Sequence, residues 1–330
     1  MKKQIRVGVI GASGNIGRYT HCENIVKYTD GAVLTAVSSS SKTSVQKVAD
    51  LYGVQAMENA EELITSDQVD AVLICSNNET HVPYTIRALE EGKPVFLEKP
   101  MANTLTEAEL LIEAEKKAGE HMIQVGFMRR YDPDYIEMKK VLDSGKLGAP
   151  LMVHCISRTR YTNLDKRPDS EHITVIGVHE VDICRWLLGE NMKEVMVRFP
   201  RSTTVVTGDS RDPQFLLMQT ENDILIDVEA TANSYYGYEI LCEVVCEKGT
   251  IRLPVTPSVM VRSYLNVGQA LPPDWNERFV VAYRNEVQHW IDYLRGETDV
   301  PGPGTEDGYE ACRICDALIR AQETGHWETV

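Results

Sequence analysis

The feature that most constrains this fold is a strand-like run that leads directly into a glycine turn. Val7–Ile10 is followed by Gly11-Ala-Ser-Gly14-Asn-Ile-Gly17 and then by a helix-like stretch. A strand, a glycine turn and a helix start bring backbone N–H groups to the positive end of a helix, where they can approach a pyrophosphate. The pattern predicts the first unit of a dinucleotide-binding sheet. An ordinary glycine-rich turn between a strand and a helix is the alternative.

Short β-branched runs and helical patterns alternate over the following hundred residues. Thr106, with Glu109 three residues later, predicts a capping box in the last helix. Such alternation is typical of a doubly wound parallel sheet. Strands are predicted over 5–10, 33–38, 69–75, 94–98 and 122–126, and helices near 16–29, 43–53, 59–65, 81–91 and 104–119.

The pattern changes after residue 127, where several strands follow one another without helices between them. This is typical of an antiparallel sheet. We predict an α/β protein with a doubly wound dinucleotide-binding domain over 1–126 and an α/β domain over 127–330, the latter with a large, mainly antiparallel sheet. Its strands are predicted over 152–157, 194–199, 215–219, 224–232, 240–246 and 249–253, and its helices near 172–188, 278–295 and 305–323.

Charge and composition exclude several classes of partner. The net charge of −15 argues against nucleic acid and anionic membrane surfaces. No apolar run approaches the ~20 residues of a membrane helix, and the N-terminus does not continue as a secretory signal. We therefore expect a cytoplasmic protein with a small-molecule substrate. Most of the eight cysteines lie in apolar runs and are predicted to be buried free thiols, and no metal site is predicted.

Polar residues at predicted strand ends provide the candidate cofactor contacts. The second strand ends in Ser38-Ser39-Ser40-Ser41-Lys42, without the acid that binds the ribose 2′-OH of NAD. Hydroxyls and an ammonium can hold a 2′-phosphate, so NADP is slightly favoured over NAD, unless the serines simply begin the next helix. For His81, the alternative to a cofactor contact is capping or packing of the following helix. The predicted cofactor-binding residues are Gly11, Ser13, Gly14, Asn15, Ile16, Ser38, Ser39, Ser40, Lys42, Ser76, Asn77, Asn78, His81, Glu98 and Lys99.

Two further segments carry candidate chemistry. The apolar run 95–97 ends in Glu98-Lys99-Pro100, and ligands of open parallel sheets bind at the carboxyl ends of strands, so Lys99 is predicted to lie beside the reacting carbon. On a helix, residues 175, 179, 182 and 186 share one face, which places His179 and Asp182 among apolar neighbours. A structural histidine and a surface lysine are the alternatives.

Four segments occur in an order that resembles the Gfo/Idh/MocA oxidoreductases, most closely the inositol 2-dehydrogenase branch. The resemblance covers nearly the whole chain. It implies a Rossmann domain over 1–126 followed by an α/β domain over 127–330 for substrate binding and oligomerisation. The open sheet of the second domain often forms an oligomer face, commonly in tetramers, so a homo-oligomer (dimer or tetramer) is expected. The segments are Val95-Phe-Leu-Glu-Lys-Pro100, Gly126-Phe-Met-Arg-Arg-Tyr-Asp132, His179-Glu-Val-Asp-Ile-Cys-Arg-Trp-Leu187 and Tyr236-Gly-Tyr-Glu-Ile-Leu-Cys-Glu-Val244.

The resemblance also implies roles for individual residues. Lys99 matches the catalytic lysine, which hydrogen-bonds the reacting oxygen, and His179 matches the acid/base. Arg129 and one of Tyr236 or Tyr238 match positions that contact the polyol, and Asp182 is expected to support the site. The implied activity is NAD(P)-dependent oxidation of a secondary alcohol of a cyclic polyol or sugar to a ketone.

Other activities stay open at this point. A glucoside or free sugar oxidised at C3 is the alternative substrate class. A non-catalytic dinucleotide sensor is an alternative of another class, and so is a redox-neutral glycoside-cleaving enzyme that oxidises and re-reduces its sugar.

The chain departs from the family pattern at two places. Val175 stands where the family usually has an acid, which would orient the imidazole and accept a substrate hydroxyl, so myo-inositol is not carried over as the substrate. The glycine loop has one extra residue, which weakens the transfer of a strict NAD preference. Separately, the polar stretch 158–169 either covers the substrate or is a plain connection.

Overall fold

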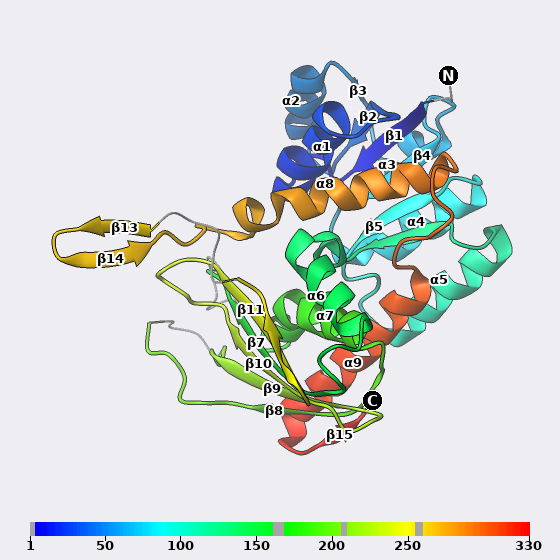
Figure 1. Ribbon diagram of the computed structural model, residues 1–330. Helices are drawn as coiled ribbons and strands as arrows, with labels where there is room; N and C mark the ends of the chain where they lie inside the picture. Colours follow the sequence, from blue (N-terminus) through cyan, green and yellow to red (C-terminus); the bar gives the residue numbers. More distant parts are fainter. Residues whose placement is uncertain (1–3, 161–167, 206–209, 255–259) are drawn as a thin grey trace. The chain divides into compact units, whose positions relative to one another are not determined.

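The computed structural model describes residues 4–160, 168–205, 210–254 and 260–330 (Figure 1). Contacts divide the chain into two units: Met1–Tyr131 with Val280–Cys312, and Asp132–Phe279 with Arg313–Val330. A single boundary at residue 126 does not describe this division, because the chain returns to the first unit after residue 279. The centre of the polar stretch 158–169 lies outside the described residues.

Unit 1 is built on a six-stranded parallel sheet of order β3-β2-β1-β4-β5-β6. This confirms the predicted doubly wound sheet, with β3 added because two residues are too few to show a periodicity. The strand order reverses between β1 and β4, and ligands of such sheets bind outside the carboxyl ends of the strands at this point. The strands are β1 (Ile5–Ile10), β2 (Ala32–Ser38), β3 (Gln55–Ala56), β4 (Ala71–Ile74), β5 (Val95–Glu98) and β6 (Ile123–Gly126).

Helices cover both faces of this sheet. One face packs against η1 (Gly17–Cys22), α1 (Glu23–Lys27), α2 (Lys42–Tyr52) and the second part of α8 (Trp275–Leu294) in one apolar cluster. On the other face, Gly8 lies against Leu63 of α3 (Ala60–Thr65). The remaining helices of unit 1 are η2 (Asn78–Thr80), α4 (His81–Glu90), α5 (Leu105–Ala118) and η3 (Met128–Tyr131).

The capping box predicted at Thr106 is wrong by two residues. The N-cap of α5 is Thr104, whose extended backbone (φ −136°, ψ 157°) precedes the first turn and whose hydroxyl accepts from the Glu107 N–H. The Glu107 carboxylate in turn accepts from the Asn103 N–H. The same threonine-to-glutamate spacing therefore caps the helix one half-turn earlier.

Unit 2 contains a seven-stranded sheet of order β12-β11-β7-β10-β9-β8-β15. Among its pairs only β7 and β10 run parallel, which confirms the mainly antiparallel prediction. The separate hairpin β13–β14 and the short β15 were not predicted. The strands are β7 (Pro150–Arg158), β8 (Met192–Arg198), β9 (Gln214–Thr220), β10 (Leu225–Thr231), β11 (Glu239–Cys246), β12 (Gly249–Arg252), β13 (Met260–Ser263), β14 (Asn266–Gln269) and β15 (Glu328–Thr329).

The two faces of this sheet differ in chemistry. On one face Cys155 of β7 contacts Cys184 of helix α7 (Val178–Leu188), with 3.7 Å between the sulfurs. The other face carries ion pairs, among them Arg158 with Glu229 at 2.6 Å. This second face is the open one that the sequence predicts.

The remaining helices are α6 (Pro133–Asp143), η5 (His172–Gly177) and α9 (Thr305–Thr324). Helix α6 was not predicted. Helix α8 has a non-helical residue, Phe279, at the division between the units. All eight cysteines are free thiols, and Cys312 and Cys315 lie within α9. None of the helices in the described ranges combines the length and apolar character needed to cross a membrane.

Candidate active site

The glycine turn after β1 leaves space at its middle position. A Cβ on Gly11 would lie 2.5 Å from the Cys75 carbonyl oxygen, and one on Gly17 would lie 2.5 Å from the Gly11 oxygen. Gly11 also has a φ of +88°, which favours glycine. A Cβ on Gly14 would meet only the Gly11 oxygen within the described chain, at 3.4 Å. The packing of the protein therefore does not require Gly14, whereas close approach of a pyrophosphate does, so the turn fits a dinucleotide.

The serines at the end of β2 have different surroundings. The Ser39 hydroxyl hydrogen-bonds the Ser13 hydroxyl of the glycine turn, which brings these two predicted residues together. Ser38 is buried and Ser40 is exposed. Ser41 accepts from the Ser44 N–H as the N-cap of α2, which is the alternative role considered for this run.

Lys42 has a partner that sequence reasoning missed. Its ammonium lies 2.7 Å from the carboxylate of Glu58, which follows β3, and both side chains are exposed. A carboxylate from a later segment therefore lies beside the lysine at the end of this serine run. Because this carboxylate offsets the one cation proposed for a 2′-phosphate, the NADP preference stays a prediction.

The segment after β4 is held by its own side chains. The Ser76 and Thr80 hydroxyls lie 2.7 Å apart, and Asn78 begins η2 after Asn77. His81 is buried, with Nδ1 at 2.8 Å from the Pro100 oxygen and Nε2 at 3.2 Å from the Ser76 oxygen. Burial lowers the pKa of His81, so the ring is neutral and its single N–H donates to one of these two carbonyl oxygens. We therefore assign His81 the packing role.

Lys99 follows directly on the carboxyl end of β5, where the sequence predicts it. The residue is half-buried and its peptide bond to Pro100 is cis. Its backbone N–H donates to the Glu98 carboxylate at 3.2 Å. The Glu98 side chain is itself buried and lies 2.7 Å from His21 of η1, so it holds the strand end rather than facing outward.

A buried cluster behind Lys99 was not predicted. His21, Glu98 and Glu286 bring their nitrogen and oxygen atoms within 4.8 Å of one another, and all three are buried. The sequence around His21 and around Glu286 does not indicate that the two side chains meet. Glu286 joins unit 1 from α8, far along the chain.

Arg129, predicted to contact substrate, is buried within η3 at the end of unit 1. Its neighbours fix this segment: Arg130 pairs with Asp307 at 2.8 Å, and the Tyr131 hydroxyl lies 3.2 Å from His289. These contacts lie within unit 1 and fix the chain directly after Arg129.

In unit 2, His179 is half-buried near the start of α7. The helix before it, η5, is a π-helix in which the Val178 N–H donates to the Ile173 oxygen five residues earlier. In this wider turn the hydrogen bonds join residues five apart, so the regular α-helical face begins only in α7. Val175 and Thr174 both lie one wide turn before His179, and both are half-buried.

Asp182 and the two tyrosines have different surroundings. Asp182 is buried on α7 next to the buried Val181 and Ile183. Tyr236 is exposed, and its hydroxyl donates to Glu239 at 2.5 Å and accepts from Arg158 at 2.9 Å. Burial raises the pKa of this hydroxyl. Tyr238 is buried edge-on against Phe279, with 6.3 Å between ring centroids. Tyr236 is thus committed to the ion pairs of the sheet.

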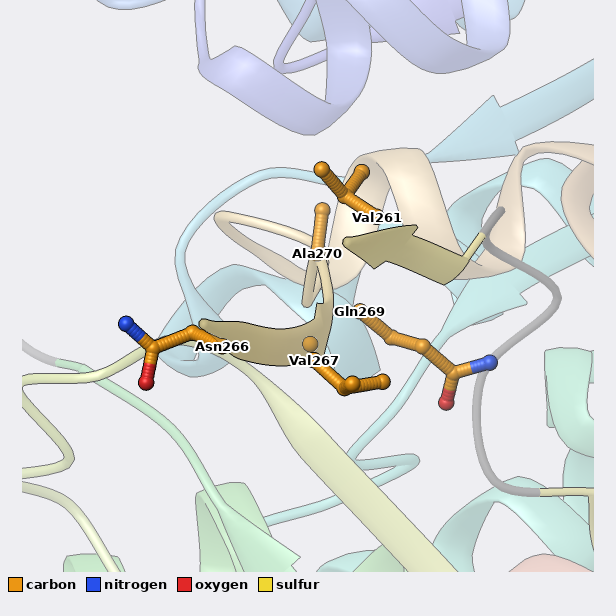
Figure 2. A pocket seen from close by; sticks show the side chains of 6 residues that line it. Val261, Asn266, Val267, Gln269 and Ala270 are labelled. Carbon is orange, nitrogen blue, oxygen red and sulfur yellow. The ribbon is translucent and has the colours of Figure 1, made fainter. Parts of the chain in front are cut away.

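A hollow on the hairpin of unit 2 contains none of the predicted site residues. It encloses about 250 Å³ and is lined by Val261 of β13, by β14 and by Ala270 (Figure 2). The lining residues are exposed and carry no titratable side chain. The hollow therefore provides no acid, base or cation for the predicted chemistry.

Comparison with known proteins places these residues in a family. The NAD-binding Rossmann domain of the oxidoreductase family Gfo/Idh/MocA matches residues 5–127, and the C-terminal α/β domain of that family matches residues 139–330. An inositol 2-dehydrogenase of Klebsiella pneumoniae is 41% identical over 97% of this chain and 94% of that protein. Inositol 2-dehydrogenase 3 of Saccharopolyspora erythraea is 39% identical over 97% and 94%.

A solved structure agrees with these relatives. The myo-inositol dehydrogenase of Lactobacillus casei, determined with NAD(H) and myo-inositol, superimposes with a TM-score of 0.94 at 30% identity and covers 99% of this chain and 97% of that one. Both family domains and their order are therefore present, and the chain belongs to the Gfo/Idh/MocA family of NAD(P)-dependent oxidoreductases that act on CH–OH groups.

Proposed function

We propose that this protein oxidises one secondary alcohol of an inositol-like cyclic polyol to a ketone. The observation that carries the proposal is the 41% identity to an inositol 2-dehydrogenase over 97% of the chain. The position of Lys99 at the carboxyl end of β5 supports it, because ligands of such sheets bind there. Reduction of the cofactor by a panel of cyclic polyols and sugars tests it, as designed at the end of the Discussion.

Two residues are proposed to act on the reacting oxygen, one by accepting its proton and one by stabilising its charge. His179 accepts the proton of the substrate hydroxyl, and Lys99 donates a hydrogen bond to the same oxygen as negative charge develops on it. Arg129 and Tyr238 bind further hydroxyls, and Asp182 supports the His179 helix. When bound at the glycine turn, NAD(P)⁺ supplies the hydride acceptor.

Val175 is proposed to limit the choice of polyol. Val175→Asp should raise kcat/KM for myo-inositol about tenfold, because a carboxylate there can accept a substrate hydroxyl and orient His179. Steady-state kinetics with myo-inositol measures the effect. Thr174→Asp is the matched control, since it adds the same charge one residue earlier on the same wide turn.

The outcomes of this pair separate three accounts. A gain from Val175→Asp alone supports the proposal. No gain from either variant shows that the limit lies elsewhere in the pocket. A gain from Thr174→Asp alone shows that the π-helix has moved the relevant position by one residue.

Cofactor preference is proposed to depend on the residues around the end of β2. Ser39→Asp should lower the ratio of kcat/KM for NADP to that for NAD at least about tenfold, because a carboxylate repels a 2′-phosphate. Glu58→Gln should raise the same ratio up to about fivefold by releasing Lys42 from an exposed ion pair. An unchanged ratio in both variants would remove this segment from cofactor selection.

Assembly and location complete the proposal. The open face of the seven-stranded sheet is proposed to form the interface of a homo-oligomer, a dimer or tetramer, which light scattering would measure. The eight free thiols suit a reducing compartment, so we place the protein in the cytoplasm.

A further inference from the structure

Three titratable side chains of unit 1 meet behind the strand end that carries Lys99. His21 and Glu286 are 0% exposed and Glu98 is 4% exposed. Their nitrogen and oxygen atoms lie within 4.8 Å of one another. Acidic side chains are almost never fully buried unless they are paired, so this cluster needs a physical reason.

The Glu98 carboxylate links His21 to the backbone of Lys99. Its Oε1 lies 2.7 Å from His21 Nε2, and its Oε2 accepts the Lys99 N–H at 3.2 Å. The rings of Phe96 and Tyr283 lie edge-on to the His21 ring, at 5.4 and 6.0 Å between centroids. The imidazole is therefore fixed, and it fixes the carboxylate that holds the Lys99 turn.

Gly126 keeps space for this carboxylate. It lies opposite Glu98 in the register of β5 and β6. A Cβ at residue 126 would lie 3.2 Å from both Cδ and Oε2 of Glu98. Any larger residue would press on the oxygen that accepts the Lys99 N–H, so the orientation of Glu98 is set from the neighbouring strand as well.

Glu286 fits beside this carboxylate only as a neutral acid. Neither of its carboxyl oxygens has a hydrogen-bond partner among the described residues, and the Gln124 amide bonds its backbone oxygen instead. Burial and the Glu98 charge raise the pKa of Glu286 well above its ordinary value. Two buried carboxylates that share one site do not both ionise at neutral pH, so Glu286 holds a proton.

The other titratable groups around Glu98 add no second anion. Burial, together with the Glu98 charge, raises the pKa of the Cys75 thiol. Burial lowers the pKa of His81, which faces Glu98 from α4. Both are neutral at pH 7.

We propose that His21 is a positioning residue for Lys99, acting through the Glu98 carboxylate, with Glu286 beside them as a neutral carboxylic acid. This inference rests on the proposed role of Lys99 in alcohol oxidation. It assigns a purpose to three groups that the proton transfer itself does not use.

The first test compares two substitutions of His21 in the full chain. His21→Leu should lower kcat about 10- to 100-fold, with the KM values for cofactor and polyol within about threefold, because Lys99 is misplaced while binding is kept. His21→Gln should recover at least about tenfold of that loss, since its amide can donate near the position of Nε2. Equal losses in both variants, or a KM effect alone, would overturn the positioning role.

Two further variants separate positioning from folding. Val287→Ala is the control, because Val287 is the buried neighbour of Glu286 on α8 and packs in the apolar cluster. It should lower Tm without changing kcat. Gly126→Ala approaches Glu98 from the other strand and should lower kcat about 3- to 10-fold even if His21→Leu does not fold. A Gly126→Ala enzyme with unchanged kcat would contradict the proposal.

The neutral acid has readouts that do not depend on activity. The native state keeps a proton on Glu286 that the unfolded chain releases above about pH 4.3, so stability falls as pH rises towards the raised pKa. The Tm of Glu286→Gln should therefore rise relative to the unmodified protein between about pH 5 and about pH 8. The infrared C=O band of a protonated carboxylic acid should be present at pH 7 and lost in Glu286→Gln.

Two results would contradict a protonated Glu286. One is a Tm difference that does not change with pH, together with no acid band. The other is a stoichiometric divalent metal that co-purifies with the protein and is lost in Glu286→Gln, which would make the cluster a metal site. If instead Lys99→Ala retains activity, the proposed function of Lys99 fails while the Tm and infrared results for Glu286 still stand.

Discussion

Lys99→Ala is expected to lower kcat by about 10³-fold or more. The ammonium is the one donor proposed to stabilise the charge that develops on the reacting oxygen, and losing such a preorganised donor costs about 10²–10³-fold by itself. The positive charge of the ammonium makes this hydrogen bond stronger than one from a neutral donor. The dissociation constant for the dinucleotide should stay within about threefold, because the glycine turn and the strand ends are unchanged.

Stopped-flow or steady-state kinetics with the best polyol measures this, and dinucleotide binding is measured by fluorescence. Lys117→Ala is the matched control, since Lys117 is an exposed lysine on α5 of the same unit. A Lys99→Ala enzyme that keeps a tenth of the original kcat would remove the lysine from the mechanism.

His179→Asn should lower kcat about 10²- to 10⁴-fold, which is the usual contribution of a positioned general base. The pH profile is the sharper readout. A base must be neutral to accept the hydroxyl proton, so kcat of the unmodified enzyme should fall at acidic pH, where His179 would be protonated. The residual rate of the variant should not show this acidic limb.

His326→Asn is the control for this experiment, because His326 is an exposed histidine of unit 2. It should leave both kcat and the acidic limb in place. If His179→Asn kept the acidic limb, another group would be the base, and the buried His172–Asp212 pair of the same unit would be the next residues to test.

Five of the six strands of unit 1 could be predicted because each of the five is a short apolar run bounded by turns, as in Ile5–Ile10 and Val95–Glu98. Buried parallel strands show this pattern strongly. The return of residues 280–312 to unit 1 could not be predicted, since it depends on packing between distant segments. The π-helix over His172–Gly177 was missed for a related reason, as a helical periodicity does not show an added residue in one turn.

In the candidate site, too, some features could be predicted from the sequence and others depend on tertiary packing. The positions of Lys99 and Ser39 directly after strands could be predicted, and the topology brings such strand ends together. The side chains that contact these strand ends from distant parts of the sequence could not be predicted. Glu58 reaches Lys42 from beyond β3, and Glu286 reaches Glu98 from α8. Local sequence patterns predict which backbone positions face a ligand, whereas side-chain partners depend on tertiary contacts.

The measurement that tests the account most directly is absorbance at 340 nm with purified protein. NAD and NADP are supplied in turn, each against a panel of inositols, free hexoses and glucosides. The account predicts reduction of a dinucleotide with at least one inositol, abolished in Lys99→Ala. Reduction only with hexoses or glucosides would contradict the inositol class. If no compound of the panel reduces either dinucleotide, and tight dinucleotide binding is shown separately, the proposed dehydrogenase activity is contradicted. That result would favour a sensor or a redox-neutral enzyme.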